Sequence, residues 1–315
     1  MVARFAERRA LAISGPTAIG KTALAMALAQ RLPVDLISVD SAMVYRQMDI
    51  GTAKPSAVEL ALAPHALIDL VDPSEAYSTA RFLHDAGDVV ADSFARGRIP
   101  VFVGGTMMYF NALREGLADL PAADAEVRAA LAAELAARGG SALHAELARV
   151  DPAAAQRIEP ANRQRLLRAL EVYRISGKPI SAYWGEQRPM LQSHGAELLE
   201  VTLVPRDRAA LYARIDRRFG AMLEQGLLGE VETLYARGDL SLELPSMRSV
   251  GYRQLWQHLA GELSLDAAAA QACQATRRLA KRQLTWQRSW TDLCRLHCDD
   301  GIETQDAVLR LLRSG

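Results

Sequence analysis

Short apolar runs alternate with helical patterns over the first third of the chain. The apolar runs predict strands at residues 10–13, 35–39 and 99–103, and the segments between them predict helices at residues 21–31 and 79–96. Alternation of this kind is typical of a parallel sheet covered by helices. We therefore predict an α/β fold in which ligands bind at the carboxyl ends of the strands.

Helical patterns rich in alanine and punctuated by five prolines replace this alternation from about residue 116 to residue 196. Strand character returns at residues 198–204, and further helical stretches follow. The last long helix starts at Ser264 and runs to about Trp290, so its length is about 40 Å. The sequence thus predicts a core domain made of residues 1–115 and 197–315, interrupted by an all-helical insertion domain at residues 116–196.

Composition and charge narrow the class of protein. Of the 315 residues, 50% are hydrophobic and 23% are charged, which excludes a disordered, collagen-like or coiled-coil chain. The 37 basic and 37 acidic residues cancel. This balance excludes a general basic coat for nucleic acids, but it allows a local basic region.

The sequence shows neither a membrane span nor an export signal. The longest apolar stretch, residues 99–113, is shorter than the roughly 18 residues that a spanning helix needs, and it contains two glycines and an asparagine. Only four apolar residues follow the basic pair Arg8 and Arg9. We therefore expect a cytoplasmic protein that does not bind membranes.

The three cysteines, Cys273, Cys294 and Cys298, have no CxxC spacing. His297 lies beside two of them, but a fourth ligand and a second paired motif for zinc are missing. We expect reduced thiols.

A P-loop motif, G-x-x-x-x-G-K-[ST], follows the first predicted strand and precedes a predicted helix, which is the context that its chemistry requires. Backbone N–H groups of such a loop surround a phosphate, Lys21 neutralises its oxygens, and the Thr22 hydroxyl can bind Mg²⁺. The residues predicted to bind a diphosphate or nucleotide are Gly15, Pro16, Thr17, Ala18, Ile19, Gly20, Lys21 and Thr22. Mg²⁺ is the expected cofactor, with Thr22 as its protein ligand. The motif predicts di- or triphosphate binding but leaves the reaction open.

Two further polar groups end predicted strands at the same edge of the sheet. Asp40 could hold Mg²⁺ or act as a base toward a hydroxyl or an amine, as in P-loop kinases, or it could only cap the next helix. The Gly104-Gly105-Thr106 turn adds a hydroxyl after another strand. A P-loop, a carboxylate and a hydroxyl that converge at one edge are what a catalytic site requires.

Positive charge is concentrated in two stretches. Residues 160–190 carry six basic against two acidic side chains, and residues 267–291 carry five basic and no acidic ones, among them Lys281 and Arg282. An excess of positive charge over stretches of this length favours binding to a polyanion such as RNA over the alternative of a charged face exposed to solvent. Arg214 and Arg217, three residues apart on a predicted helix, are candidates for a diphosphate or an RNA backbone, with ordinary surface arginines as the alternative.

Several segments of the chain resemble the tRNA dimethylallyltransferase (tRNA isopentenyltransferase) family. They occur in the family's order at residues 15–22, 40–46, 49–55, 103–109, 164–168, 248–253 and 281–286. Ile19 departs from the family, which usually has a small polar residue at that place in its P-loop. The resemblance implies a P-loop NTPase-like fold and transfer of a dimethylallyl group from dimethylallyl diphosphate to N6 of the adenosine 3′-adjacent to the anticodon. The tRNA anticodon stem-loop and dimethylallyl diphosphate are then the partners, and we expect a monomer.

The resemblance also implies roles for single residues. Asp40 matches the family's general base toward the attacking amine, and Thr106 matches the threonine that orients the reacting groups and stabilises the leaving oxygen. The target base has to leave its stack to reach them. The positions that match tRNA contacts are Asp40, Ser41, Ala42, Met43, Thr106, Arg128, Gln164, Arg165, Leu166, Leu167, Arg168, Arg248, Ser249, Val250, Gly251, Tyr252, Arg253, Lys281 and Arg282. Tyr252 could be a stacking platform for a splayed base or a core aromatic.

Two other classes of P-loop protein compete with this interpretation. A small-molecule kinase would need a lid and an adenine pocket, and the two basic stretches argue against it. A nucleotide-dependent switch protein would need a guanine-specifying motif such as N-K-x-D, which the sequence lacks.

Overall fold

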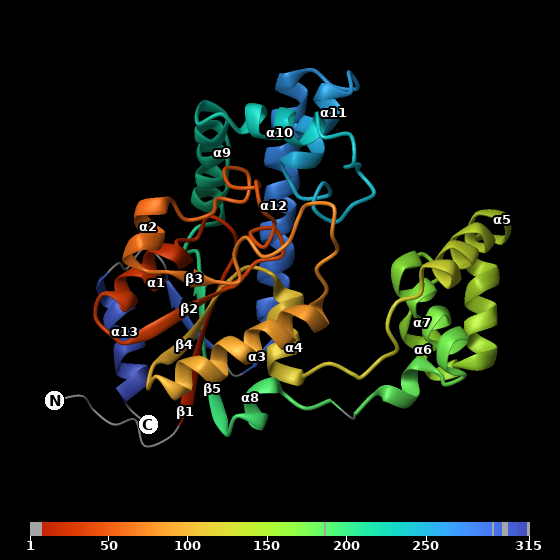
Figure 1. Ribbon diagram of the computed structural model, residues 1–315, viewed down its shortest axis with the longest axis horizontal. Helices are drawn as coiled ribbons and strands as arrows, with labels where there is room; N and C mark the ends of the chain where they lie inside the picture. Colours follow the sequence, from red (N-terminus) through yellow and green to blue (C-terminus); the bar gives the residue numbers. More distant parts are fainter. Residues whose placement is uncertain (1–7, 186, 292, 298–301, 314–315) are drawn as a thin grey trace. The chain divides into compact units, whose positions relative to one another are not determined.

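The computed structural model describes residues 8–185, 187–291, 293–297 and 302–313 (Figure 1). The chain divides into two compact units. One unit comprises residues 1–114 and 190–315, and the other comprises residues 115–189. Each unit is described by itself below.

A six-stranded sheet forms the centre of the first unit, with the strand order β3-β2-β4-β1-β5-β6 and all pairs parallel. The strands are β1 (Arg8–Ser14), β2 (Val34–Val39), β3 (His65–Ala66), β4 (Ile99–Gly104), β5 (Ala196–Val204) and β6 (Cys294–His297). Ser14 pairs with Gly104 on one side and with Thr202 on the other, and Val39 also pairs with Gly104. The central strands therefore end at the same level, and the turns after β1, β2 and β4 meet at one edge.

Helices cover both faces of this sheet because its strands are apolar on both faces. Leu11 and Ile13 of β1 pack into a core with residues of α1, α9 and α13, whereas Ala10 and Ala12 pack into a second core with residues of α3, α4 and α12. The helices of this unit are α1 (Lys21–Ala29), α2 (Ala57–Leu62), α3 (Thr79–Ala95), α4 (Met107–Glu115), α8 (Met190–Ser193), α9 (Arg208–Glu224), α10 (Leu227–Tyr235), α11 (Tyr252–Leu259), α12 (Leu265–Ser289) and α13 (Ile302–Arg313). The predicted α/β fold with a parallel sheet is confirmed.

The second unit is all-helical in its described residues. It contains α5 (Ala125–Val150), α6 (Pro152–Arg157), α7 (Arg163–Ser176) and a 3-10 helix (Ile180–Tyr183). Non-helical backbone at Gly139, with φ of 76°, bends α5 so that its two halves pack with α7 around buried leucines. The contacts end this unit at residue 189, seven residues before the predicted boundary, because α8 packs against α3 and β5.

Some elements carry too little pattern to be predicted from the sequence. The strand β3 has two residues, β6 has four, and α2 has no buried residue, so none of them shows a hydrophobic period. Cys273 and Cys294 carry free thiols, and Cys298 lies outside the described residues. Within the described part of the chain, every helix is too short or too polar to cross a membrane.

Gly104 lies where β4 passes closest to β2, and a Cβ atom there would overlap the carbonyl group of Val39. Since backbone cannot yield as a side chain can, we expect Gly104→Ala to lower the free energy of unfolding by about 3 kcal/mol. Urea denaturation measures this loss. Gly220→Ala is the control, because an added Cβ in α9 meets nothing within 4 Å. It should raise stability by about 0.5–1 kcal/mol, and equal stability of the two variants would contradict the close approach.

Candidate active site

The P-loop connects β1 to α1 with its backbone turned toward the edge of the sheet. Gly20 precedes α1 with φ of 103°, a conformation that favours glycine. A Cβ atom on Gly15 would lie 2.9 Å from Cγ2 of Ile19, whose side chain is 2% exposed and packs into the core. Ile19 therefore points away from the phosphate cradle, which explains how the loop accommodates this departure from the family.

Lys21 folds back over the P-loop at the first turn of α1. Its Nζ donates hydrogen bonds to the carbonyl oxygens of Gly15 at 3.1 Å and Pro16 at 2.9 Å. Burial lowers the pKa of Lys21 to about 8, while Asp40 acts to raise it and Arg218 to lower it. The ammonium group is thus held where a phosphate would bind.

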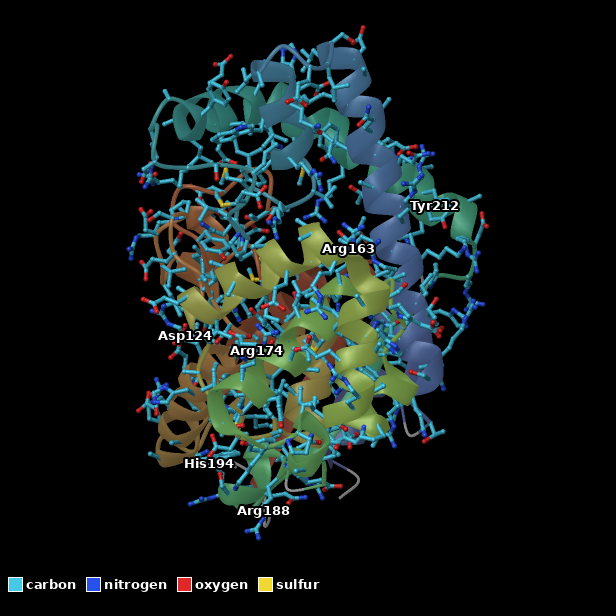
Figure 2. The ribbon with its side chains drawn as sticks, turned by 90° about the vertical axis from the view of Figure 1, so that its right-hand side faces the viewer. Asp124, Arg163, Arg174, Arg188, His194 and Tyr212 are labelled. Atoms are coloured by element: carbon cyan, nitrogen blue, oxygen red, sulfur yellow. The ribbon has the colours of Figure 1, made fainter. Side chains whose placement is uncertain are left out.

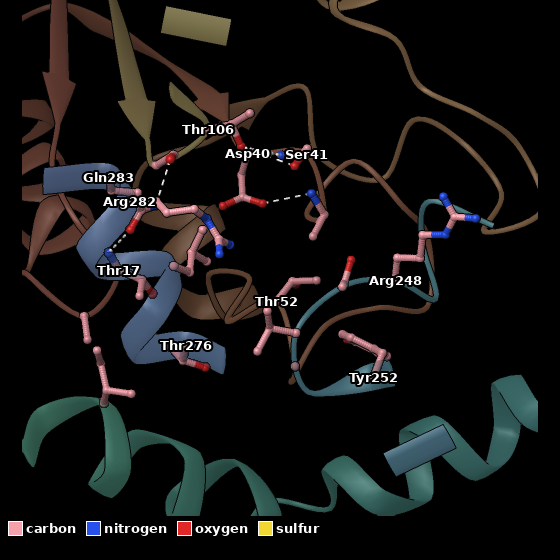
Figure 3. A pocket seen from close by; sticks show the side chains of 18 of the residues that line it. Thr17, Asp40, Ser41, Thr52, Thr106, Arg248, Tyr252, Thr276, Arg282 and Gln283 are labelled. Atoms are coloured by element: carbon pink, nitrogen blue, oxygen red, sulfur yellow. Dashed lines mark hydrogen bonds between the residues drawn. The ribbon is translucent and has the colours of Figure 1, made fainter. Parts of the chain in front are cut away.

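Asp40 follows β2 and faces a cavity (Figure 3). Its Oδ1 accepts hydrogen bonds from the N–H groups of Ala42 at 2.9 Å and Met43 at 3.3 Å. Burial raises the pKa of Asp40, although these hydrogen bonds and the charges of Lys21 and Arg218 act to lower it. One oxygen therefore caps the turn at residues 41–43, and the carboxylate still faces the cavity. The alternative that Asp40 only caps the next helix is wrong, because α2 begins at Ala57 and has Ser56 as its N-cap.

Thr106 ties the turn after β4 to the turn after β2. Its Oγ1 accepts a hydrogen bond from the N–H group of Ser41 at 3.0 Å and donates to the Ser41 hydroxyl at 3.3 Å (Figure 3). The carboxylate and the hydroxyl that the sequence predicted to converge are therefore on adjacent turns.

Gln283 of α12 is a residue whose role the sequence did not reveal. Its Oε1 accepts a hydrogen bond from the Thr17 N–H group at 2.9 Å, and its Nε2 donates to the Gly105 carbonyl oxygen at 2.7 Å (Figure 3). A Cβ atom on Gly105 would lie 2.6 Å from that Nε2. The buried amide thus fixes the P-loop against the turn after β4, and Gly105 leaves room for it.

Arg218 is the charged residue that the sequence interpretation missed. It lies on α9 one helical turn after Arg214, and it interacts electrostatically with both Asp40 and Lys21. Burial lowers its pKa, and Asp40 partly offsets that effect. The i, i+4 spacing from Arg214 was the signal available in the sequence, whereas the prediction followed the i, i+3 pair Arg214 and Arg217.

Two neighbouring cavities contain most of the predicted residues of this unit. The first has a volume of about 500 Å³, and its predicted lining residues are Thr17, Ala18, Asp40, Ser41, Ala42, Thr106, Arg248, Ser249, Val250, Tyr252 and Arg282. The second has a volume of about 450 Å³, and its predicted lining residues are Ala18, Ile19, Gly20, Lys21, Thr22, Arg214 and Arg217. Arg218 lines both cavities. Arg253 and Lys281 are exposed and lie outside these linings.

Tyr252 is a core residue and not a stacking platform. Its side chain is fully buried, its ring packs beside Gly51, and its hydroxyl donates to Oε1 of Glu230 at 2.5 Å. The core alternative is therefore the correct one of the two.

The predicted tRNA contacts of the second unit differ in their surroundings. Gln164 and Arg165 are exposed at the start of α7, where Figure 2 labels the neighbouring Arg163. Leu166 is fully buried, so its side chain belongs to the core of the unit, unlike those of Gln164 and Arg165. Arg128 and Arg168 both form ion pairs with Glu171, at 2.8 Å each.

Comparison with known proteins identifies the family. The family model described as IPP transferase matches residues 43–290, and the model described as Isopentenyl transferase matches residues 8–69. A curated relative, the tRNA dimethylallyltransferase of Thioalkalivibrio sulfidiphilus, is 57% identical over 281 residues, which is 89% of this chain and 87% of that protein. The tRNA dimethylallyltransferase 2 of Hahella chejuensis is 51% identical over 314 residues, with 96% and 94% coverage. This chain belongs to the IPP transferase (tRNA dimethylallyltransferase) family.

Solved structures support the same placement. The full-length tRNA isopentenylpyrophosphate transferase of Bacillus halodurans has a TM-score of 0.69 and 37% identity, with 98% of each chain covered. A eukaryotic dimethylallyltransferase acting on tRNA has a TM-score of 0.77 and 26% identity, over 93% of this chain and 74% of that one. The resemblance and the P-loop NTPase-like fold inferred from the sequence are therefore confirmed, and the small-molecule kinase interpretation is not favoured.

The pKa of Lys21 predicts how the binding of a diphosphate at the P-loop would depend on pH. Below about pH 8 the ammonium is charged, and above it the free protein has to take up a proton in order to bind. The affinity for dimethylallyl diphosphate without tRNA should therefore fall above pH 8, by up to about tenfold per pH unit. Calorimetric titration from pH 7 to pH 9 measures this. Lys21→Arg keeps its charge over that range and should lose the dependence. The same pH dependence in both proteins would exclude Lys21 as the titrating group.

Proposed function

We propose that this protein transfers a dimethylallyl group from dimethylallyl diphosphate to N6 of the adenosine 3′-adjacent to the anticodon in tRNA. Family membership supports this reaction, and one observation of the site carries it. The Asp40 carboxylate faces a cavity that has P-loop residues in its lining on one side and the segment from Arg248 to Tyr252 on the other (Figure 3). The proposed general base, Asp40, thus lies between the P-loop, which binds the diphosphate, and the segment that contacts the acceptor nucleotide.

The donor half of the proposed reaction uses the P-loop. Lys21 and the backbone N–H groups of the loop bind the diphosphate, with Arg218 as a further cation and Arg214 and Arg217 in the adjoining cavity. When the allylic C–O bond breaks, negative charge grows on the leaving diphosphate. Preorganised cations and N–H groups stabilise that charge without reorganisation.

The acceptor half uses Asp40. Adenine N6 is a weak nucleophile because its lone pair is delocalised into the ring, so a base that takes the proton as the C–N bond forms lowers the barrier. Burial already raises the pKa of Asp40, and a bound diphosphate would raise it further. We assign the general base to Asp40, and to Thr106 the orientation of the reacting groups from the adjacent turn.

Mg²⁺ fits the oxygen ligands on the donor side. Thr22 follows Lys21 at the start of α1 and lines the same cavity, so its hydroxyl is the ligand we assign. Among the described residues, no group of three His, Cys, Asp or Glu side chains could hold a metal ion. This donor set suits Mg²⁺, which keeps waters and binds mainly phosphate oxygens, and the bound ion would neutralise charge on the leaving diphosphate.

The proposed macromolecular partner is the anticodon stem-loop of tRNA. In the first unit, the exposed Arg253, Lys281 and Arg282 supply positive charge, and the exposed Arg248 forms an ion pair with Glu243 at 2.7 Å. In the second unit, Gln164 and Arg165 are exposed at the start of α7. A cytoplasmic location follows from the proposed tRNA substrate, and action as a monomer stays a prediction.

The proposed reaction is tested by incubating the protein with labelled dimethylallyl diphosphate, Mg²⁺ and unmodified tRNA in which adenosine follows the anticodon. We expect label in the RNA, at N6 of that adenosine. Asp40→Asn should lower turnover by about 10²- to 10⁴-fold, because the amide can still accept the two backbone hydrogen bonds but cannot take the proton.

Binding of tRNA to Asp40→Asn should stay within several-fold of wild type, which separates chemistry from recognition. Unlabelled RNA together with phosphate transfer from ATP to a metabolite would end the prenylation proposal. A folded, fully active Asp40→Asn enzyme would remove only Asp40 from it.

Arg165 is the sharpest test of tRNA binding by the second unit. Its side chain is exposed, and Arg165→Ala should weaken tRNA binding and reduce the slope of log K against log[salt] by about 0.9, as expected for one phosphate contact. Arg138→Gln removes the same charge from α5, where the guanidinium pairs with Glu134 and Glu146, and is the control. Binding measured over about 50–200 mM salt that changes equally in both variants would contradict a direct contact.

A further inference from the structure

Two segments far apart in the sequence form one wall of the active-site cavity. Gly51 and Thr52 come from the loop between β2 and α2, and Arg248, Ser249, Val250 and Tyr252 come from the start of α11 and the turn before it. No described strand pairs them. Their separation therefore depends on side-chain contacts.

Glu230 of α10 joins the two segments through one carboxylate. Its Oε2 accepts hydrogen bonds from the N–H groups of Asp49 at 2.9 Å and Ile50 at 2.8 Å. Its Oε1 accepts from the Gly51 N–H group at 3.1 Å and from the Tyr252 hydroxyl at 2.5 Å. Three successive backbone N–H groups thus converge on a negative charge, as they do in anion-binding nests.

Packing beside the carboxylate leaves little freedom. A Cβ atom on Gly51 would lie 2.6 Å from Cε2 of Tyr252 and 2.8 Å from Cδ1 of Leu227, so the loop backbone touches the ring directly. The Tyr252 ring therefore fits against the loop only because Gly51 has no side chain. The Gly51 N–H group and the Tyr252 hydroxyl both donate to the same oxygen, Oε1 of Glu230.

The loop is held in a strained shape from its other side as well. Gln47 and Ala53 have φ of 64° and 54°, in the left-handed region that residues other than glycine rarely adopt. The buried Nζ of Lys54 donates to the Tyr45 carbonyl oxygen at 3.0 Å, and to carboxylate oxygens of Asp49 and Asp69 at 2.5 Å each. A strained backbone of this kind persists only where several surrounding contacts hold it in place. The hydrogen bonds of Glu230 are the contacts that join the loop to α11.

We propose that Glu230 is a positioning residue for the acceptor: by holding the N–H groups of residues 49–51 and the Tyr252 hydroxyl together, it sets the wall that keeps the target nucleotide opposite Asp40. This inference rests on the proposed function. In Figure 3, Thr17 of the P-loop lies on one side of Asp40, and Thr52, Tyr252 and Arg248 lie on the other. Glu230 therefore acts on the acceptor wall, while Gln283 holds the P-loop on the donor side. The same loop reaches the P-loop cavity only further along, at Ala53, Lys54 and Pro55, where Lys54 has hydrogen bonds of its own.

Glu230→Gln tests this role with little change of shape. The amide keeps one acceptor oxygen, but its NH₂ group has to face either two backbone N–H groups or the Gly51 N–H group and the Tyr252 hydroxyl. The hydroxyl can turn to accept, but in both orientations at least one backbone N–H group loses its acceptor. The kcat/KM for tRNA, at saturating dimethylallyl diphosphate, should fall by at least about tenfold. The Kd of dimethylallyl diphosphate without tRNA should stay within about twofold, because Gln283 holds the P-loop and Lys54 holds the part of the loop that lines its cavity. Glu232→Gln, an exposed glutamate on the same helix, should behave as wild type in both measurements.

The outcomes separate this inference from the proposed function. A wild-type protein that does not prenylate tRNA refutes the proposed function. An active wild type with an unchanged Glu230→Gln variant refutes the positioning role alone. A variant whose tRNA kinetics and number of donor sites fall together with the folded fraction has lost only stability, and that result also overturns the proposal.

Tyr252→Phe keeps the inference testable if Glu230→Gln does not fold. The substitution removes one of the four hydrogen bonds and keeps the ring against Gly51. We expect the same selective loss with a smaller size, about threefold in kcat/KM for tRNA with an unchanged donor Kd. An unchanged kcat/KM in this variant would overturn the positioning role.

Discussion

The register of the parallel sheet is the constraint on which the site depends. Because Ser14, Val39 and Gly104 are aligned across β1, β2 and β4, three turns from distant parts of the sequence begin at one level. Gly104 permits the closest approach of two of these strands. Because the strands are aligned, short side chains can link the turns, as the hydrogen bonds between Thr106 and Ser41 show. Backbone pairing thus sets the position of the site to within a few ångströms, and the buried amide of Gln283 and the carboxylate of Glu230 refine it from two sides.

Electrostatics couples the two halves of the site. Burial disfavours the charged forms of Asp40, Lys21 and Arg218, so it raises the pKa of Asp40 and lowers those of Lys21 and Arg218. The opposite charges partly offset this cost. A bound diphosphate would favour the charged form of both cations and disfavour that of the carboxylate. In the proposed reaction, donor binding therefore favours the charged forms of the cations that stabilise the leaving group and makes the carboxylate a stronger base.

The sequence predicted what local pattern determines. Alternating apolar runs define the long strands and helices, and the motifs containing Lys21 and Asp40 lie at strand ends because the chemistry needs backbone turns there. What it could not predict are contacts between segments about 180 residues or more apart. Nothing in the local sequence shows that Glu230 faces three backbone N–H groups or that Gln283 bridges two turns, since both could equally be surface residues. Tyr252 and Leu166 show a second limit of prediction from the sequence. A motif match identifies positions in the chain, but it does not show which of their side chains are buried.

The charge counted from the sequence is the property whose interpretation the structure changes most. The excess of basic residues from residue 160 to residue 190 has less effect than its count indicates, because acidic residues of this stretch and of the preceding one pair with some of them within the same unit. Arg168 pairs with Glu171, and Arg174 pairs with Glu134 and Glu146 (Figure 2 labels Arg174). Positive charge that is already paired contributes little to counterion release from RNA. The exposed arginines at the first turn of α7 keep their charge, and the helix dipole there adds to it. In the described part of this stretch, the positive charge available to an RNA backbone therefore lies at the start of α7 and at the exposed Lys178 and Arg188.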